Sequence, residues 1–375
     1  MPDTTDSASA LERIRAEIDG IDLQLQELLN RRAACAQQVA EVKKAELLLT
    51  HGHAGPGQVQ FYRPEREAQV LRRVMARNDG PLPATEVAHI FREIMSACLA
   101  LEKPMTIAFL GPEGTFTQAA AVKHFGYAVQ SRPLPSIGAV FEEVESGEAD
   151  YGVVPVENST EGMVTHTLDN FVGSTLKICG EVELPIRHHL LGAPGCRLEN
   201  VTRICAHQQA LAQCRHWLEK NWPRIEQQPT SSNAEAARLA VADSTIAAIA
   251  GDMAREAYGL VTLAASIQDY ADNTTRFLVV GREMVKPSGS DKTSIIVSTH
   301  NKPGALFKLL EPFQREQLML TRIDTRPSRA QPWTYLFFIE FEGHQDDPKV
   351  AAVLAELEEQ TVMLKILGSY PQAVI

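Results

Sequence analysis

The stretch Asp272–Gly281 (DNTTRFLVVG) places two threonine hydroxyls and the guanidinium of Arg276 at the start of an apolar run. The run is short and rich in β-branched residues, which predicts a buried strand. A hydroxyl such as that of Thr275 can donate a proton to a leaving oxygen, and an arginine fork can hold a carboxylate by two parallel bonds. Polar side chains at a strand end are a common ligand site in α/β proteins. A polar turn before a strand also explains the stretch, so the rest of the chain has to decide.

The composition is that of a globular chain with more than one domain. Its 375 residues are too many for one ordinary core, and 44% of them are apolar. Asp and Glu outnumber Lys and Arg by 47 to 36, and the net charge of −11 argues against general nucleic-acid binding. We find neither a secretory signal nor an apolar run that could span a membrane, so we expect a cytoplasmic protein.

Cysteine and histidine spacing predicts no metal site. The six cysteines form no C-x-x-C pair, and the histidine pairs lack further ligands at metal spacing. A turn at Gly111–Thr117 leads from a predicted strand into a helix and suits an anion, but it lacks the Lys-Ser/Thr ending of a P-loop. We therefore expect no metal and no cofactor.

The region 1–103 has the pattern of an all-α domain. Apolar residues recur every three or four positions from Leu11 to Val42, which predicts a helix of about 35 residues or more, roughly 50 Å long. Two shorter helices follow, near 66–75 and 83–101. Two short helices cannot cover so long a stripe, so we expect a partner chain to cover it.

Three cations on the long helix suit a dianionic ligand. Arg32 and Lys43 are about three turns apart and share a face of the helix. Arg15 lies some 25 Å further along and about 100° around, so it reaches the same site only from the partner in an antiparallel dimer. A three-helix bundle with solvated basic residues is the alternative.

The motif L-x-x-I-R-x-x-I-x-x-I-D-x-x-L-x-x-L-L-x-x-R from Leu11, followed by V-x-x-V-K-K and P-E-R-E, resembles the all-α chorismate mutases, which are intertwined helical dimers. The resemblance implies that the partner's Arg15 acts with Arg32 and Arg66 to hold the two carboxylates of chorismate. It further implies that Lys43 bonds the ether oxygen of the breaking C–O bond and that Glu67 bonds the substrate hydroxyl. The reaction is a unimolecular rearrangement to prephenate, which needs positioning and charge stabilisation but no cofactor.

Two positions depart from that family's pattern. Arg63 stands where an acidic residue is often found, and Glu102 stands where a glutamine donates to the ether oxygen. A carboxylate cannot donate, so Glu102 has to be protonated to take this role. This predicts mutase activity that rises as the pH falls below neutral. A helical domain that serves only for dimerisation is the alternative.

The region 105–285 alternates predicted strands and helices, which indicates α/β layers. The strands fall into two clusters, so we expect two lobes with a ligand cleft between them. The predicted strands are near 105–110, 151–156, 176–183, 203–206, 247–250, 260–263 and 277–280. The predicted helices are near 137–145, 210–220, 233–241 and 253–258.

Hydroxyl and amide side chains recur in the loops of this region, at Thr115, Asn158, Ser159, Thr160, Gln213, Ser231, Ser232 and Thr275. A domain that only binds a small carboxylate would show the same residues. Four motifs in order, however, resemble the prephenate dehydratases: G-P-E-G-T-F-T from Gly111, D-Y-G-V-V-P-V-E-N-S-x-x-G from Asp150, H-x-Q-A-L-A-Q-C from His207 and N-T-T-R-F from Asn273.

That resemblance implies a two-lobed fold like that of type II periplasmic binding proteins. It also implies conversion of prephenate to phenylpyruvate, with loss of carbon dioxide and water. Thr275 matches the acid toward the departing hydroxyl, and Arg276 and Phe277 complete its motif. The other prephenate-binding positions implied are Asn158, Ser159, Thr160 and Gln213.

The region 290–375 follows a linker and has the predicted order βαββαβ, which is ferredoxin-like. Gly304-Ala305-Leu306-Phe307 and Thr325-Arg326-Pro327-Ser328 resemble the two motifs of phenylalanine-sensing ACT domains, with Asp324-Thr325 where Glu-Ser is usual. The effector-binding residues implied are Asn301, Gly304, Ala305, Leu306, Arg326 and Pro327. A domain that serves only for dimerisation is the alternative.

Together these resemblances are to the bifunctional chorismate mutase/prephenate dehydratase family. They imply a homodimer or higher homo-oligomer that is inhibited by L-phenylalanine. The partners expected are small molecules and a second copy of the chain, with no nucleic acid and no membrane. An amino-acid-sensing binding protein without catalysis is the alternative from a different class.

Overall fold

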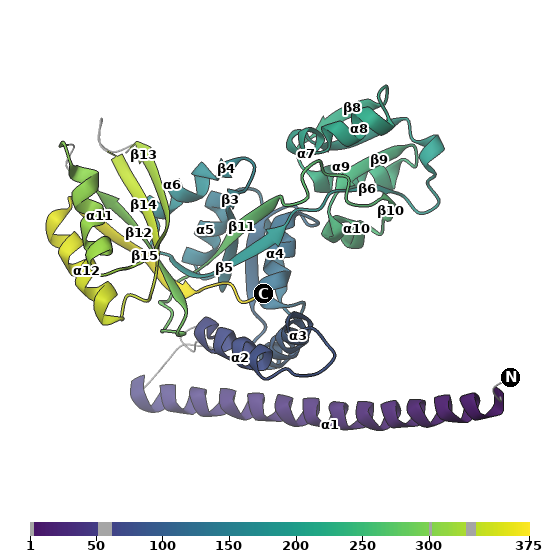
Figure 1. Ribbon diagram of the computed structural model, residues 1–375, viewed down its shortest axis with the longest axis horizontal. Coiled ribbons are helices and arrows are strands. Elements are labelled where there is room, and N and C mark those ends of the chain that lie inside the picture. The colour runs from purple at the N-terminus through teal and green to yellow at the C-terminus, as the bar shows by residue number, and fades with distance from the viewer. Residues whose placement is uncertain (1–3, 52–61, 300–301, 328–334) are drawn as a thin grey trace.

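The computed structural model describes residues 4–51, 62–299, 302–327 and 335–375. Its N-terminal region is helical, with α3 packed against both α1 and α2 (Figure 1). Leu71 of α2 and Ala88 of α3 are fully buried, and α1 is buried at Ala40. The helices are α1 (Thr4–His51), α2 (Pro64–Ala76) and α3 (Ala84–Glu102).

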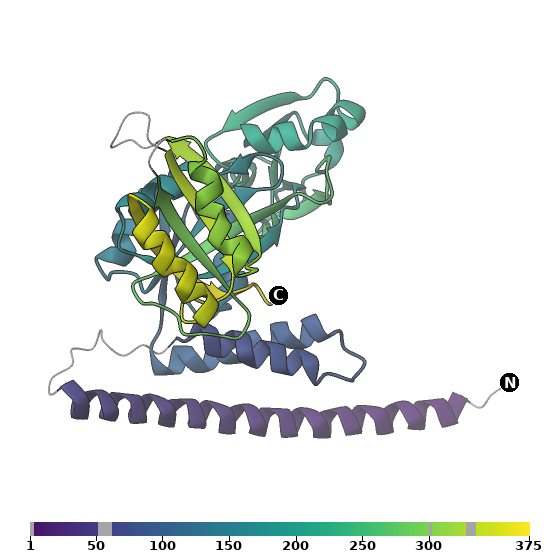
Figure 2. The ribbon, with the colours of Figure 1, turned by 60° about the vertical axis from the view of Figure 1, so that its left-hand side comes forward.

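Helix α1 has 48 residues and a length of roughly 70 Å, in agreement with the prediction of 35 residues or more. Figure 2 shows that it extends well beyond α2 and α3. The apolar stripe along its N-terminal half is between 41% and 57% exposed in the single chain. The stripe consists of Leu11, Ile14, Ile18, Ile21, Leu25, Leu28 and Leu29.

The first lobe of the central region is a mixed sheet in the order β2-β1-β3-β11-β5, with β4 paired to β3. Strand β11 runs antiparallel to both of its neighbours, whereas β1, β2 and β3 are parallel. Helix α4 packs on one face of the sheet, and α5 and α6 pack on the other. The strands are β1 (Thr106–Leu110), β2 (Gln130–Leu134), β3 (Tyr151–Asn158), β4 (Gly162–Met163), β5 (Lys177–Pro185) and β11 (Thr274–Gly281). The helices are α4 (Phe116–Phe125), α5 (Ile137–Glu145) and α6 (Thr165–Gly173).

The second lobe is a sheet in the order β10-β6-β9-β7-β8. Two segments, 186–188 and 265–273, connect it to the first lobe, so the two-lobed arrangement predicted from the sequence is present (Figure 1). The strands are β6 (His189–Gly192), β7 (Arg203–His207), β8 (Glu226–Thr230), β9 (Ile246–Ala250) and β10 (Val261–Ala264). The helices are α7 (Gln208–Gln213), α8 (Arg215–Asn221), α9 (Asn233–Ala242) and α10 (Asp252–Tyr258), with a short 3-10 turn, η1 (Leu198–Asn200).

Several elements of this region differ from the predictions. The helix expected at 210–220 is two helices that meet at Cys214. Edge strands β2 and β8 were missed because each is polar and contains a proline, so neither has the apolar pattern of a strand. Short strands β4 and β6 and helix α6 were also missed.

The C-terminal region has the predicted βαββαβ order, folded as an antiparallel sheet β13-β14-β12-β15. Helices α11 and α12 cover one face of the sheet. On the other face, Ile296 and Leu336 join the core of the first lobe beside Phe171. The elements are β12 (Asp291–Ser298), α11 (Ala305–Arg315), β13 (Leu320–Pro327), β14 (Tyr335–Glu342), α12 (Pro348–Gln360) and β15 (Met363–Pro371). Among the described residues, no helix combines the length and apolarity needed to cross a bilayer.

Gly152 of β3 tests how tightly the first lobe is packed. A Cβ there would lie 2.7 Å from Val140 Cγ1 and 3.0 Å from Val280 Cγ2, so α5 and β11 would both have to move. We expect Gly152→Ala to lower the unfolding free energy by about 1–3 kcal/mol. Thermal unfolding followed by circular dichroism measures this. Gly173→Ala is the matched control, because a Cβ at Gly173 meets nothing within 4 Å. An equal loss in both variants would contradict the packing described here.

Candidate active site

The candidate site lies where β3 ends and β11 begins, at the connection between the two lobes. The register of the two strands places Thr275 opposite Asn158. The Asn158 amide Nδ2 donates to Thr275 Oγ1 at 2.8 Å. Because the hydroxyl oxygen accepts this bond, the hydroxyl proton of Thr275 is free to point at a ligand.

The loop after β3 fixes which way the Asn158 amide points. Asn158 Oδ1 accepts from Thr160 Oγ1 at 2.6 Å, from the Thr160 amide at 3.0 Å and from the Glu161 amide at 3.2 Å. Three donors on the oxygen leave the NH₂ group facing Thr275. Asn158 itself is buried, whereas Thr160 and Glu161, which donate to it, are exposed.

Asn273 also belongs to the site, although the sequence analysis gave it no role. Its Oδ1 accepts from Asn158 Nδ2 at 3.0 Å and from Ser159 Oγ at 3.4 Å. Its own Nδ2 is buried and has no hydrogen-bond partner among the described residues. A buried unpaired donor is costly in a folded protein, so this NH₂ group is a candidate ligand contact. The sequence could have indicated this residue, since Asn273 is the first residue of the N-T-T-R-F motif.

The second lobe contributes Gln213, at the end of α7. Gln213 Nε2 donates to Thr160 Oγ1 at 3.5 Å, which links the two lobes. On its other side, Gln213 Oε1 lies 2.8 Å from His188 Nε2. Burial lowers the pKa of His188 below its usual value, so the ring is neutral and Nε2 carries the donated proton.

His188 is the functional candidate that sequence reasoning missed. Its backbone ties together the two connecting segments, since its amide donates to Gln268 Oε1 and its carbonyl accepts from the Ile267 amide. Its Nδ1 is buried and has no hydrogen-bond partner among the described residues. No motif marks this histidine, because only the fold brings it next to Gln213.

Two of the loop hydroxyls noted in the sequence are helix caps. Thr115 Oγ1 accepts from the Gln118 amide at the start of α4 and donates to the Leu110 carbonyl. Ser232 Oγ accepts from the Glu235 amide at the start of α9. Their local partners explain both residues without a ligand.

Arg276 and Phe277 do not join the catalytic hydroxyls, which corrects the prediction for both. Successive side chains of a strand point to opposite faces, so the guanidinium of Arg276 leaves the site. It donates to Glu181 Oε2 at 2.9 Å and to Glu340 Oε1 at 2.7 Å. Phe277 is 2% exposed and packs in the core of the first lobe with Phe109.

The predicted mutase residues are only partly gathered in the single chain. Arg15 and Arg66 are exposed, whereas Arg32, Lys43 and Glu102 are half-buried. Arg15 belongs to the N-terminal half of α1, and the N-terminal end of this helix extends away from α2 and α3 (Figure 2). Arg63 pairs with Glu65 at 2.7 Å.

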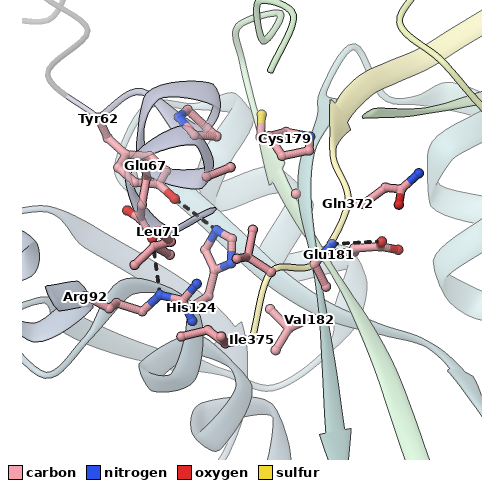
Figure 3. Close-up of a pocket in the computed structure, with 16 residues that line it drawn as sticks. Tyr62, Glu67, Leu71, Arg92, His124, Cys179, Glu181, Val182, Gln372 and Ile375 are labelled. Carbon is pink, nitrogen blue, oxygen red and sulfur yellow. Dashed lines mark hydrogen bonds and ion pairs between the residues drawn. The ribbon is translucent and has the colours of Figure 1, made fainter. Parts of the chain in front are cut away.

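Glu67 is placed differently from the prediction, at a junction of the domains. Its carboxylate pairs with Arg92 at 3.3 Å, and Arg92 also donates to the Lys123 carbonyl of α4. Burial raises the pKa of Glu67, partly offset by Arg92. Figure 3 shows these side chains around a cavity of about 30 Å³ whose lining includes the C-terminal residues Gln372–Ile375. Glu67 therefore faces the first lobe.

The described effector residues of the prediction lie in two places, at the start of α11 and at the end of β13. Gly304 has a φ of 81° and caps α11, which starts with Ala305 and the half-exposed Leu306. Arg326 pairs with Asp169 of α6 at 2.8 Å, so it is tied to the first lobe. Pro327 ends β13, and Asn301 lies outside the described residues.

Three family models match successive parts of the chain: chorismate mutase type II at residues 14–103, prephenate dehydratase at 107–285 and the ACT domain at 293–359. A bifunctional chorismate mutase/prephenate dehydratase of Pseudomonas aeruginosa is 54% identical over 97% of this chain and 98% of its own. A bifunctional enzyme of the same name from Stutzerimonas stutzeri is 52% identical over 98% of this chain and 99% of its own. The solved structure of a prephenate dehydratase from Arthrobacter aurescens in complex with L-Phe is 38% identical, with a TM-score of 0.66. It covers 71% of this chain, which spans 89% of that one.

Asn158→Asp tests the hydrogen bond at the centre of the site. The substitution keeps the shape of the side chain, but the carboxylate cannot donate to Thr275 and instead accepts its hydroxyl proton. We expect the rate of prephenate conversion to fall by about 10²- to 10³-fold, the usual effect of losing one such donor. Steady-state kinetics with prephenate measures this. The control is Asn170→Asp on α6, where the amide donates to the His166 carbonyl, and it should retain activity. Full activity of Asn158→Asp would rule out the role given to this bond.

Proposed function

Because the chain belongs to the family of bifunctional chorismate mutase/prephenate dehydratases, we propose roles for its residues in both reactions. The enzyme rearranges chorismate to prephenate and then converts prephenate to phenylpyruvate. We assign the first reaction to residues 1–103 and the second to residues 105–285. The observation that carries the dehydratase assignment is the bond from Asn158 to Thr275, which leaves one hydroxyl proton available in a partly buried site.

In the dehydratase reaction, Thr275 donates its proton to the hydroxyl group that leaves the prephenate ring. The C–O bond breaks as water departs, the C–C bond to the ring carboxylate breaks as carbon dioxide departs, and the ring becomes aromatic. The Thr275 oxygen is then briefly anionic, and the Asn158 NH₂ group is already aimed at it. Thr275 recovers its proton from solvent after product release.

Prephenate is held between the lobes by Ser159, Thr160 and Gln213, together with the free NH₂ group of Asn273. Since Gln213 and Thr160 come from different lobes, a ligand that bonds both favours closure about the connecting segments. This is the behaviour expected of a two-lobed domain like the type II periplasmic binding proteins. His188 holds the Gln213 amide so that its NH₂ group faces Thr160 and the substrate.

In the mutase reaction, the partner's Arg15 acts with Arg32 and Arg66 on the two carboxylates of chorismate. Lys43 and a protonated Glu102 bond the ether oxygen, where negative charge develops in the transition state. We leave Glu67 out of this site, because Arg92 already engages its carboxylate on the side that faces the first lobe. The exposed apolar stripe of α1 supports an antiparallel dimer, since a second copy would bury it.

Residues 290–375 act as the regulatory domain, for which we propose L-phenylalanine as the inhibitor. The support is the match to the ACT family and the L-Phe complex of the Arthrobacter dehydratase. The amide groups that follow Gly304 at the start of α11 suit the carboxylate of an amino acid.

The experiment that tests the whole assignment is one assay of the purified protein with chorismate, with and without phenylalanine. We expect chorismate to disappear, phenylpyruvate to form, and phenylalanine to suppress its formation. If chorismate persists while added prephenate is consumed, the helical domain serves only for dimerisation. If neither substrate is converted, the chain is a binding protein without catalysis.

Glu102→Gln tests the position at which this chain has a glutamate where the chorismate mutases have a glutamine. A glutamine donates at every pH, whereas Glu102 donates only when it is protonated. We expect the variant to flatten the pH profile between pH 5 and 8 and to raise mutase activity above pH 7 by roughly 10- to 100-fold, the worth of a hydrogen bond to a charged group. Initial rates of chorismate loss measure this, with Glu86→Gln on the exposed side of α3 as the control. A wild-type enzyme with a flat profile would contradict the role of Glu102.

Ile18→Glu combined with Leu25→Glu tests the antiparallel dimer. Two buried charges in the interface should convert the protein to a monomer at micromolar concentration. Mutase activity should then be lost, because Arg15 no longer reaches a partner, while dehydratase activity remains. Size-exclusion chromatography with light scattering measures the mass. Ala16→Glu, on the opposite side of α1, should leave the dimer intact. A charged variant that stays dimeric would contradict this interface.

A further inference from the structure

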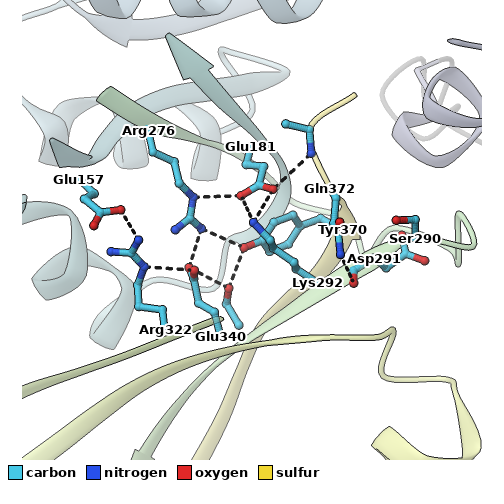
Figure 4. Close-up of polar contacts among 12 residues, drawn as sticks. Glu157, Glu181, Arg276, Ser290, Asp291, Lys292, Arg322, Glu340, Tyr370 and Gln372 are labelled. Atoms are coloured by element: carbon cyan, nitrogen blue, oxygen red, sulfur yellow. Dashed lines mark hydrogen bonds and ion pairs between the residues drawn. The ribbon is translucent and has the colours of Figure 1, made fainter. Parts of the chain in front are cut away.

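Six charged side chains meet where the C-terminal sheet covers the first lobe (Figure 4). The first lobe supplies Glu157 of β3, Glu181 of β5 and Arg276 of β11, and the C-terminal domain supplies Lys292 of β12, Arg322 of β13 and Glu340 of β14. Three acids and three bases make a group without net charge. We call this group the ion cluster.

Arg276 is the centre of the ion cluster. It pairs with Glu181 at 2.9 Å and with Glu340 at 2.7 Å. Lys292 pairs with Glu181 at 2.8 Å, and Tyr370 of β15 lies 3.4 Å from an Arg276 nitrogen. Each strand of the C-terminal sheet therefore contributes a side chain to this one group.

The central charges of the ion cluster are buried. Arg276 is 6% exposed, Glu181 4% and Glu340 7%. Because a buried charge that loses its partner is left uncompensated, these side chains favour arrangements in which each charge keeps a partner. The positions of β11 and of the C-terminal sheet are therefore coupled through these pairs.

The ion cluster stands directly behind the catalytic residues. Arg276 follows Thr275 in β11, and Glu157 precedes Asn158 in β3, so each charged side chain leaves the sheet on the face opposite the hydroxyl site. Ser159 and Thr274, which bond each other, line the same cavity of about 390 Å³ as Arg276. A movement of Arg276 therefore moves Thr275 with it.

The ion cluster can also be paired in a second way. Arg322 forms an ion pair with Glu157 and lies 3.5 Å from Glu340 Oε2, so two acids compete for it. Neither Arg322 Nε nor Glu340 Oε2 forms a hydrogen bond among the described residues, although both are buried. Drawing Glu340 fully onto Arg322 would satisfy both atoms and leave Arg276 paired with Glu181 alone.

Strand β13 connects the pairing of Glu340 to the predicted effector motif. Arg322 and Arg326 are four residues apart in β13, so their side chains share the face that meets the first lobe. Arg326 belongs to the predicted effector motif and pairs with Asp169 of α6. A ligand that shifts Arg326 shifts Arg322 on the same strand.

We propose that the ion cluster positions Thr275 and Asn158 for the dehydratase reaction, and that the C-terminal domain inhibits the reaction by drawing Glu340 from Arg276 to Arg322. Arg276 and Glu340 are then positioning residues, and the described pairing is the active one. This proposal rests on the proposed function, from which it takes the reaction and the effector.

The test uses the full-length chain with Glu340→Gln and with the pair Arg276→Met/Glu340→Met. The first variant keeps the shape of the side chain, and the second replaces a buried pair by apolar groups that usually preserve stability. We expect kcat for prephenate to fall by about 10- to 100-fold with little change in KM, because the catalytic atoms are displaced. Phenylalanine should inhibit the remaining activity less than about twofold. Mutase activity of the same polypeptide should be unchanged.

Lys365→Met is the matched control. Lys365 of β15 donates to the carbonyls of Phe171, Val172 and Ser174, so it also joins the two domains, and these three partners lie in and after α6 rather than on β3 or β11. It should lower the melting temperature while kcat and inhibition stay as in the wild type. Arg276→Lys, which keeps a charge for Glu340, should recover part of kcat.

Two results would overturn the inference. One is wild-type kcat and inhibition in both ion-cluster variants, and the other is an equal loss in Lys365→Met, which would mean that any loosening of the interface suffices. These differ from failure of the proposed function, in which the wild-type enzyme itself does not convert prephenate or does not respond to phenylalanine.

Discussion

The pairing of β3 with β11 is the constraint on which the rest of the structure depends. It brings together Asn158 and Thr275, which are 117 positions apart in the sequence. Strand β11 can pair there only because the chain leaves the first lobe after β5, builds the whole second lobe, and returns antiparallel. The second lobe, which carries Gln213, is thus inserted in the sequence between β5 and β11. Closure of the lobes and alignment of the catalytic pair depend on the same two connecting segments.

The two faces of that strand pair have different physical characters. On one face, neutral amides and hydroxyls form a network in which each donor has a defined direction, which suits proton donation to a leaving group. On the other face, paired charges are buried against a second domain. The separation places the charges of Arg276 and Glu157 on the face opposite Asn158 and Thr275. It also gives the C-terminal domain a contact to β11, the strand that carries Thr275.

The sequence predicted much of this organisation, because several signals are local. The apolar stripe of α1, the helix at 137–145 and the βαββαβ order of the last region all follow from periodicity, and the structure has each of them. Edge strands β2 and β8 could not be predicted, since their polar residues face solvent. Asn158 and Thr160, which the motif predicts as site residues, are close in the sequence, and the structure joins them by a hydrogen bond.

Other parts of the site could not be predicted because adjacency in sequence is not adjacency in space. Arg276 follows Thr275 in one motif, but the two-residue period of a strand sends it to the other face. Glu67 follows Arg66 on a helix, yet its carboxylate turns to Arg92 of the neighbouring helix. His188 and Gln213 lie 25 positions apart and meet only through the fold.

The segment Gln372–Ile375 has a consequence for how a local change spreads through the molecule. It lines the cavity between α2 and β5, and the Ala373 amide donates to Glu181 of the ion cluster. The Gln372 amide donates to the Ser290 carbonyl, beside the start of β12. One short segment therefore meets the helical region, the first lobe and the C-terminal sheet. A substitution in it alters the packing of all three, so its effect cannot be assigned to a single domain.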